Sequence, residues 1–313
     1  MESLLPWGMV VVGIVGLGLG ASWLVDGASR LALRLGVSPM VVGLTVVGFG
    51  TSMPEFAVSV RAAIYGSGAL SVGNAVGSNI MNLLLVLGVA AVLKPIHVVG
   101  GERVLRRDLA FGLVPAVLLM AAAWRGFIGR PVGLTLVAVF VVFIVVALRS
   151  ATQPDGTRIV VGGSPLAHLA LTVVGIVVLV VGSELMVRGG VDIARRFGVS
   201  EAVIGLTLIA FGTSLPELAT SVTAALKGES EISIGNVLGS NIFNLGLVVG
   251  TAFTIRPAAV PIFVIHQDIP FLVVATFLVG RVVVRDGRIS RAEGGMMLVL
   301  VAAYIAFVVV RGG

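Results

Sequence analysis

The sequence predicts an all-α membrane protein with ten transmembrane helices, arranged as two inverted five-helix repeats with broken helices at an ion site. Of its 313 residues, 58% are hydrophobic and 12% charged, and the mean hydropathy is +1.13. Soluble chains carry about 25% charged residues. Apolar runs of about 20 residues, long enough to cross a bilayer, recur along the chain. The third observation is an internal repeat with a constant separation of 162 positions.

The repeat is clearest in two polar segments that occur once in each half. Gly-Thr-Ser-Met-Pro-Glu at 50–55 returns as Gly-Thr-Ser-Leu-Pro-Glu at 212–217. The segment 73–82, Gly-Asn-Ala-Val-Gly-Ser-Asn-Ile-Met-Asn, has its counterpart at 235–244. Duplicated, interrupted helices of this kind are typical of transporter binding sites.

Hydropathy predicts five spans in each half. They cover residues 4–25, 39–65, 70–93, 109–123, 128–148, 166–187, 202–226, 232–255, 269–284 and 295–310. Breaker residues in 149–165 predict a connecting loop between a first repeat at 1–148 and a second at 166–313. Because each unit has an odd number of spans, the second must be inverted relative to the first.

Positive charges predict the orientation. Lysine and arginine are more frequent on the side that holds the loop 149–165, so we expect that side to be cytoplasmic and both termini to lie outside an inner membrane. The net charge of +6 fits lipid headgroups and not nucleic acid, since the arginines lie between apolar spans.

The repeated Pro-Glu pairs predict helix breaks inside the membrane. Pro54 and Pro216 cannot donate a backbone hydrogen bond, so each helix should break beside them. The spacing places Thr51 and Glu55 on one face, with Ser52 close by. A carboxylate inside the bilayer costs about 2.5–3.5 kcal/mol on insertion scales and usually has a function.

The side chains of both motifs offer oxygen atoms, which suit hard cations such as Ca²⁺ and Na⁺. Ser78 and Asn82 are four residues apart and share a face. The chain has no cysteine, and no histidine accompanies the motifs. We find no Ser-His-Asp group, HExxH motif or P-loop, and therefore predict neither an enzyme nor a resident cofactor.

Two alternative interpretations concern structure alone. Ser52-x-x-Glu55 and its repeat could be capping boxes at helix starts. The asparagines could form hydrogen bonds between helices. We favour this second interpretation for Asn74, Asn79, Asn236 and Asn241, which lie off the face that carries Ser78 and Asn82.

Together, the paired segments resemble the alpha-repeats of sodium/calcium exchangers, in the cation/calcium antiporter superfamily. The resemblance covers essentially the whole chain and is closest to compact prokaryotic exchangers. It implies central calcium ligands at Glu55 and Glu217, with Thr51 and Thr213 beside them. It also implies sodium sites at Ser52, Ser78, Ser214 and Ser240, backbone carbonyls near Gly48 and Ala210, and supporting positions at Asn82 and Asn244. Many relatives have aspartate at the position of Asn244.

The predicted function is therefore exchange of Ca²⁺ for Na⁺ by alternating access. Proton- or potassium-coupled antiport and a passive cation channel are the alternatives. Ca²⁺ and Na⁺ are the expected substrates and membrane lipid the surroundings, and no obligatory protein partner is inferred.

Overall fold

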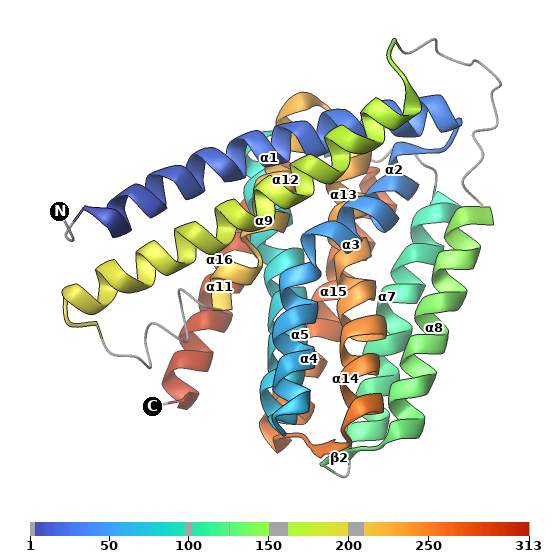
Figure 1. The fold of residues 1–313 in the computed structure, drawn as a ribbon. Helices are drawn as coiled ribbons and strands as arrows, with labels where there is room; N and C mark the ends of the chain where they lie inside the picture. The colour runs from blue at the N-terminus through green and yellow to red at the C-terminus, as the bar shows by residue number, and fades with distance from the viewer. Residues whose placement is uncertain (1–3, 98–101, 125, 150–161, 200–209, 313) are drawn as a thin grey trace.

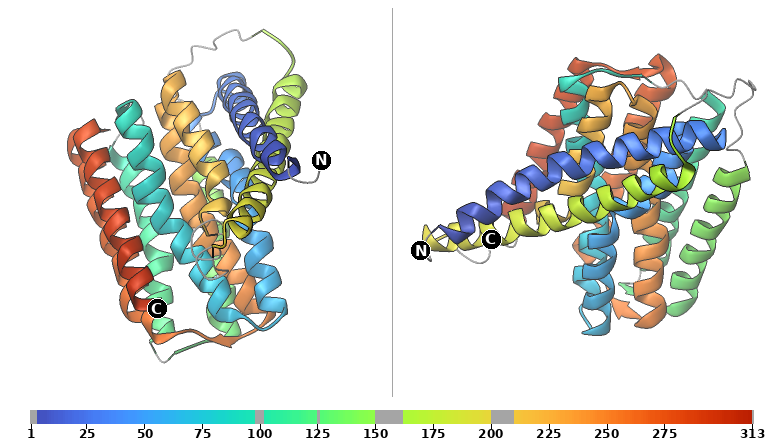
Figure 2. Two further views of the ribbon diagram at one scale, coloured as in Figure 1. Left: turned by 90° about the vertical axis from the view of Figure 1, so that its left-hand side faces the viewer. Right: turned by 45° about the horizontal axis from the view of Figure 1, so that its top comes forward.

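The computed structural model describes residues 4–97, 102–124, 126–149, 162–199 and 210–312. Two long helices, α1 (Leu5–Leu35) and α9 (Pro165–Arg196), lie side by side in opposite directions across the other helices (Figures 1 and 2). Their backbones meet at glycines, since a Cβ on Gly20 would lie 2.5 Å from the Leu179 nitrogen. Such small residues let membrane helices approach closely.

Both long helices extend beyond their predicted spans, 4–25 and 166–187. α1 continues through the polar positions Asp26 and Arg34 and ends at Gly36, whose φ is 66°. Hydropathy detects only the apolar part of a helix, whereas the helix ends at a residue that adopts the left-handed conformation easily.

The helix at 39–65 is broken where the sequence predicts. Its first part comprises α2 (Pro39–Val42), the π-helical segment η1 (Gly43–Val47) and α3 (Gly48–Thr51). The second part, α4 (Met53–Ile64), is bent by 50° from the first. The next helix comprises α5 (Gly68–Met81), η2 (Asn82–Val86) and α6 (Leu87–Leu93).

The second half has corresponding segments around Ser214. They are α11 (Ala210–Thr213), α12 (Leu215–Lys227), α13 (Ser230–Phe243), η4 (Asn244–Val249) and α14 (Gly250–Ile255). Residues 202–209 of the predicted span lie outside the described residues. The α13–α14 helix is central, because 94% of its most apolar window is buried, against 67% for α5–α6.

The remaining helices surround this centre (Figure 1). They are α7 (Glu102–Ala123), α8 (Arg130–Arg149), η5 (Val264–Asp268), α15 (Ile269–Asp286) and α16 (Arg291–Gly312). Two short antiparallel pairs each join one half to the other. β1 (Ile96–His97) pairs with β4 (Arg288–Ile289), and β2 (Phe127–Ile128) pairs with β3 (Ala258–Ala259).

In the described parts, seven helices are long and apolar enough to cross a membrane, and the bent helix at 39–64 forms an eighth. The span expected at 109–123 corresponds to a shorter apolar stretch, Leu109–Ala122, within α7. The span expected at 202–226 begins outside the described residues. The helical class and its apolar spans agree with a membrane protein.

Candidate cation-binding site

The two repeated glutamates lie in the first turn that follows each helix break. Glu55 belongs to α4 and Glu217 to α12, and both residues are 0% exposed. The two carboxylates are close enough for their charges to interact. Two buried like charges require a counter-charge, because desolvation and repulsion both oppose their ionised forms.

The serines at the breaks do not cap the helices that follow them. The Ser52 hydroxyl donates to Glu217 Oε1 at 2.9 Å and makes no hydrogen bond to its own helix. Ser214 also makes no capping bond, and its buried hydroxyl has no partner in the described part of the chain. The capping-box interpretation is therefore wrong. The breaks hold both serines near φ −88° and ψ 3–9°, not in the extended conformation of an N-cap.

Hydroxyl groups and a carbonyl gather where α3 meets α13. The Gly48 carbonyl lies 3.3 Å from both Thr51 Oγ1 and Ser240 Oγ, and these two hydroxyls lie 3.3 Å from each other. Thr51 also donates to Asn236 Oδ1 at 3.0 Å. A Cβ on Gly48 would lie 2.9 Å from the Ser240 nitrogen, so glycine permits this close approach. Three predicted site residues, one of them for its carbonyl, thus lie together.

Several oxygens at the centre lack partners. Within the described residues, neither Glu55 oxygen nor Glu217 Oε2 has a hydrogen bond of normal geometry. The Thr213 and Ser78 side chains face Glu55, while Thr51 and Ser240 face Glu217 from the equivalent positions. A buried carboxylate oxygen without a donor is costly. A cation bound between the carboxylates would satisfy these oxygens.

Asn82 and Asn244 lie one helical turn beyond Ser78 and Ser240. Each asparagine begins a π-helical segment, η2 or η4. Such local π segments frequently occur at functional sites. Both residues are 0% exposed, and both Oδ1 atoms lack a partner in the described structure.

The other repeated asparagines connect neighbouring helices, as the sequence predicts. Asn74 Nδ2 donates to the Glu55 carbonyl at 3.3 Å, and Asn236 Nδ2 donates to the Glu217 carbonyl at 3.4 Å. One contact that the sequence did not reveal is the bond from Thr51 to Asn236, which crosses between the halves. The repeat shows that both residues recur, but not that they meet.

Ala210 is the remaining predicted position. It is the first residue of α11, and its side chain lies outside the described part. The participation of its backbone carbonyl stays a prediction.

The arrangement combines two carboxylates with hydroxyl, amide and carbonyl oxygens. Among the described residues, no three acidic or histidine side chains gather. The described acidic part of the site therefore consists of Glu55 and Glu217, which together carry at most two negative charges. Oxygen atoms from such groups are the ligands that Ca²⁺ and Na⁺ prefer.

The sequence profile described as "Sodium/calcium exchanger protein" matches residues 5–149 and 167–310. The chain belongs to the sodium/calcium exchanger family. Members of this family are transporters and not enzymes. This exchanger is also 31% identical to the sodium/calcium exchanger MaX1 of Methanosarcina acetivorans, over 96% of this chain and 97% of that one. It is 34% identical to the inner membrane protein YrbG of Escherichia coli, over 88% and 87%.

The fold agrees with a solved exchanger structure. The sodium-calcium exchanger NCX_Mj, soaked with 10 mM Na⁺ and zero Ca²⁺, is 31% identical to this exchanger. The similarity covers 97% of this chain and 98% of the other, with a TM-score of 0.85. With its apolar helices, the exchanger is an integral membrane protein and a cation/Ca²⁺ antiporter by family.

Proposed function

We propose that this exchanger moves Ca²⁺ in one direction and Na⁺ in the other, through one site between Glu55 and Glu217. The observation that carries the proposal is the pair of fully buried carboxylates, three of whose four oxygens lack a partner among the described residues. One Ca²⁺ or at least two Na⁺ would neutralise the pair.

The same electrostatics explain why transport would be an exchange. Without a cation, the two carboxylates would carry about two negative charges past a low-dielectric barrier, which is strongly unfavourable. The site would therefore change sides only when it is loaded. Obligatory coupling of the two ions follows from this rule.

For the ion ligands, we propose that both glutamates bind Ca²⁺ together with Thr51 and Thr213. The proposed sodium ligands are the four serines of the motifs and two backbone carbonyls, while two asparagines complete the centre. These residues are Ser52, Ser78, Ser214, Ser240, Gly48, Ala210, Asn82 and Asn244.

For the architecture, we propose two inverted five-helix repeats, residues 1–148 and 166–313, which make ten spans. Matching contacts support it. Asn79 and Asn241 each donate to the other's carbonyl, at 2.9 and 3.2 Å. The two strand pairs also correspond under exchange of the halves.

The two sides of the site differ in a way that supports alternating access. Gly235 and Asn236 are buried, whereas their counterparts Gly73 and Asn74 are exposed and partly buried. In the predicted orientation, the buried side faces the cytoplasm and the exposed side faces outward. The structure would then represent an outward-facing state, and α1 and α9 would slide to reverse it.

The orientation is proposed from the arginine distribution, with both termini outside an inner membrane. Because the chain has no cysteine, a single introduced cysteine would report the side of the membrane on which its position lies. A cysteine in Leu105→Cys should resist an impermeant thiol reagent in intact cells and react after the cells are opened. Labelling in intact cells would reverse the assigned orientation.

Uptake of radioactive Ca²⁺ into proteoliposomes would test the function. We expect uptake when Na⁺ is loaded inside, and little uptake with internal K⁺ or a pH gradient alone. Uptake driven by K⁺ or protons would identify the alternative antiporters. Uptake that needs no counter-ion would indicate a passive channel.

A further inference from the structure

Four asparagines form a hydrogen-bonded ring where α5–η2 meets α13–η4. Asn79 Nδ2 donates to the Asn241 carbonyl at 2.9 Å, and Asn241 Nδ2 donates to the Asn79 carbonyl at 3.2 Å. Asn82 Nδ2 donates to Asn241 Oδ1 at 3.1 Å, and Asn244 Nδ2 donates to Asn79 Oδ1 at 3.0 Å. We call Asn79 and Asn241 the inner pair and Asn82 and Asn244 the outer pair. Each outer asparagine thus donates to the inner asparagine of the opposite half.

The chemistry of the ring fixes which end of each amide faces which partner. A backbone carbonyl only accepts hydrogen bonds. Asn79 and Asn241 must therefore turn their NH₂ groups toward these carbonyls, which leaves their Oδ1 atoms as acceptors on the other side. An acceptor requires a donor, so Asn82 and Asn244 must turn their own NH₂ groups toward the ring.

Because the NH₂ groups of Asn82 and Asn244 face the ring, their Oδ1 atoms point away from it. Asn82 and Asn244 are 0% exposed, and their Oδ1 atoms have no partner within the described residues. If either amide turned over, two acceptors would meet in the ring and a donor NH₂ group would occupy the position of the free oxygen. Both changes are unfavourable at a buried cation site.

We propose that Asn79 and Asn241 are positioning residues that determine the orientation of the cation-facing amides. Asn241 directs the Asn82 oxygen toward the cation, and Asn79 directs the Asn244 oxygen. This inference rests on the proposed function. It adds that each half of the site depends on an asparagine of the other half for a correctly oriented ligand.

Substitution by aspartate gives a specific test, because a carboxylate presents an oxygen to the cation whichever way it turns. Its other oxygen faces the acceptor Oδ1 of the ring asparagine, and alanine at that ring position removes this unfavourable contact. Asn241→Ala should raise the apparent KM for Ca²⁺ by about tenfold, the effect of losing one charge-assisted contact of about 1.4 kcal/mol. In the Asn82→Asp background, Asn241→Ala should raise the apparent KM for Ca²⁺ by about twofold or less. The Asn244→Asp background should give no such protection.

The mirror experiment supplies the control. Asn79→Ala should be rescued by Asn244→Asp and not by Asn82→Asp. Asn74→Ala removes another repeated asparagine, whose amide binds the Glu55 carbonyl and Ser59, so neither aspartate should rescue it. Each effect is measured against the matching single aspartate variant, as Na⁺-driven Ca²⁺ uptake by protein that is monodisperse in size-exclusion chromatography.

A purely packing role would give different results. The inference would be overturned if each aspartate rescued both alanine variants. It would also be overturned if no aspartate rescued either of them. If an alanine variant does not fold, Asn→Ser at the same position replaces it. If an aspartate variant binds Ca²⁺ but does not transport it, calorimetric Ca²⁺ affinity replaces uptake as the measurement. The expected crossed rescue is the same: Asn82→Asp protects against Asn241→Ala, and Asn244→Asp protects against Asn79→Ala. Absence of Na⁺-driven uptake by the wild type would reject the proposed function itself, whereas wild-type exchange without crossed rescue would reject only this inference.

Discussion

The two halves carry nearly the same site motif, yet they pack it differently. Glu217 accepts a hydrogen bond from Ser52 at 2.9 Å, whereas neither oxygen of Glu55 has such a partner among the described residues. Thr51 is 0% exposed, while its counterpart Thr213 is only partly buried. The common motif therefore supports two different environments, as expected if the halves exchange environments during transport.

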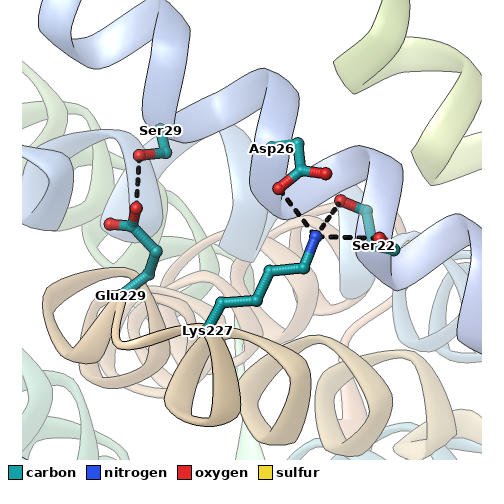
Figure 3. Close-up of polar contacts among 5 residues, drawn as sticks. All are labelled: Ser22, Asp26, Ser29, Lys227 and Glu229. Carbon is teal, nitrogen blue, oxygen red and sulfur yellow. Dashed lines mark hydrogen bonds and ion pairs between the residues drawn. The ribbon is translucent and has the colours of Figure 1, made fainter.

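The α1 helix has a charged contact with a residue whose equivalent in the first half is tyrosine. The Lys227 ammonium group, at the end of α12, contacts Asp26 at 2.6 Å and Ser22 Oγ at 2.8 Å on α1 (Figure 3). Ser29 donates to Glu229 at 2.7 Å beside them. At the position equivalent to Lys227, the first half has Tyr65. α1 is therefore bound by charge to the α12–α13 hairpin on the buried side of the site.

The largest expected effect tests what the halves share. Glu55→Gln and Glu217→Gln should each reduce exchange by about 100-fold or more, because loss of one partner in a buried charge system costs about 3–5 kcal/mol. Glutamine keeps the volume, so folding should be retained. Uptake into proteoliposomes measures the loss, and size-exclusion chromatography controls for folding. Wild-type rates in either folded variant would contradict a shared site.

The sequence predicts the shared features well, because they depend on local chemistry. Pro54 indicates the break, and the repeat identifies the oxygen-bearing side chains. The unequal environments of the two halves could not be predicted, since two similar sequences do not show which copy of the motif is more deeply buried. The ring contact between Asn82 and Asn241 depends on how two helices cross. The extension of α1 beyond residue 25 was missed because hydropathy falls at Asp26 while the helix continues.

Acid should inhibit transport by competition, which again tests the acidic pair that the halves share. Protonation neutralises the carboxylates, so lowering the pH should raise the apparent KM for Ca²⁺, by up to about tenfold per pH unit for one competing proton. Returning to higher pH, or adding excess Ca²⁺, should restore the rate. Asn244→Asp adds a third acid and should make transport more acid-sensitive or responsive to K⁺. Inhibition that excess Ca²⁺ cannot relieve would contradict competition.

Serine variants would show whether the difference between the halves is transient. Ser52→Ala removes the bond to Glu217, and Ser214→Ala removes its unpartnered counterpart. If the halves exchange environments, both variants should reduce turnover similarly, by about tenfold for a hydrogen bond to a charged group. A much larger loss in Ser52→Ala than in Ser214→Ala would indicate a permanent asymmetry. The measurement is Ca²⁺ exchange at saturating Na⁺.

The smallest expected effect concerns the ion pair on α1. Lys227→Met removes the contacts with Asp26 and Ser22. In the proposed mechanism, these contacts would stabilise the closure of the buried side. A partly exposed pair contributes about 0.2–1 kcal/mol, so the balance between states should shift by about fivefold at most. A cysteine in Gly73→Cys, on the exposed side of the site, would report the shift as slower labelling by a thiol reagent.

Arg188→Met is the matched control for Lys227→Met. Arg188 is aligned with Asp26 in the repeat, and it pairs with Glu184 at 2.5 Å within α9. Among the described residues, this pair does not join α9 to another helix. Both variants remove one positive charge and introduce the same side chain, but only Lys227→Met removes a contact between α1 and the α12–α13 hairpin. We therefore expect slower labelling in the Lys227 variant alone. Equal labelling changes in both would mean that net charge, and not the connection of α1 to the hairpin, sets the balance between the two states.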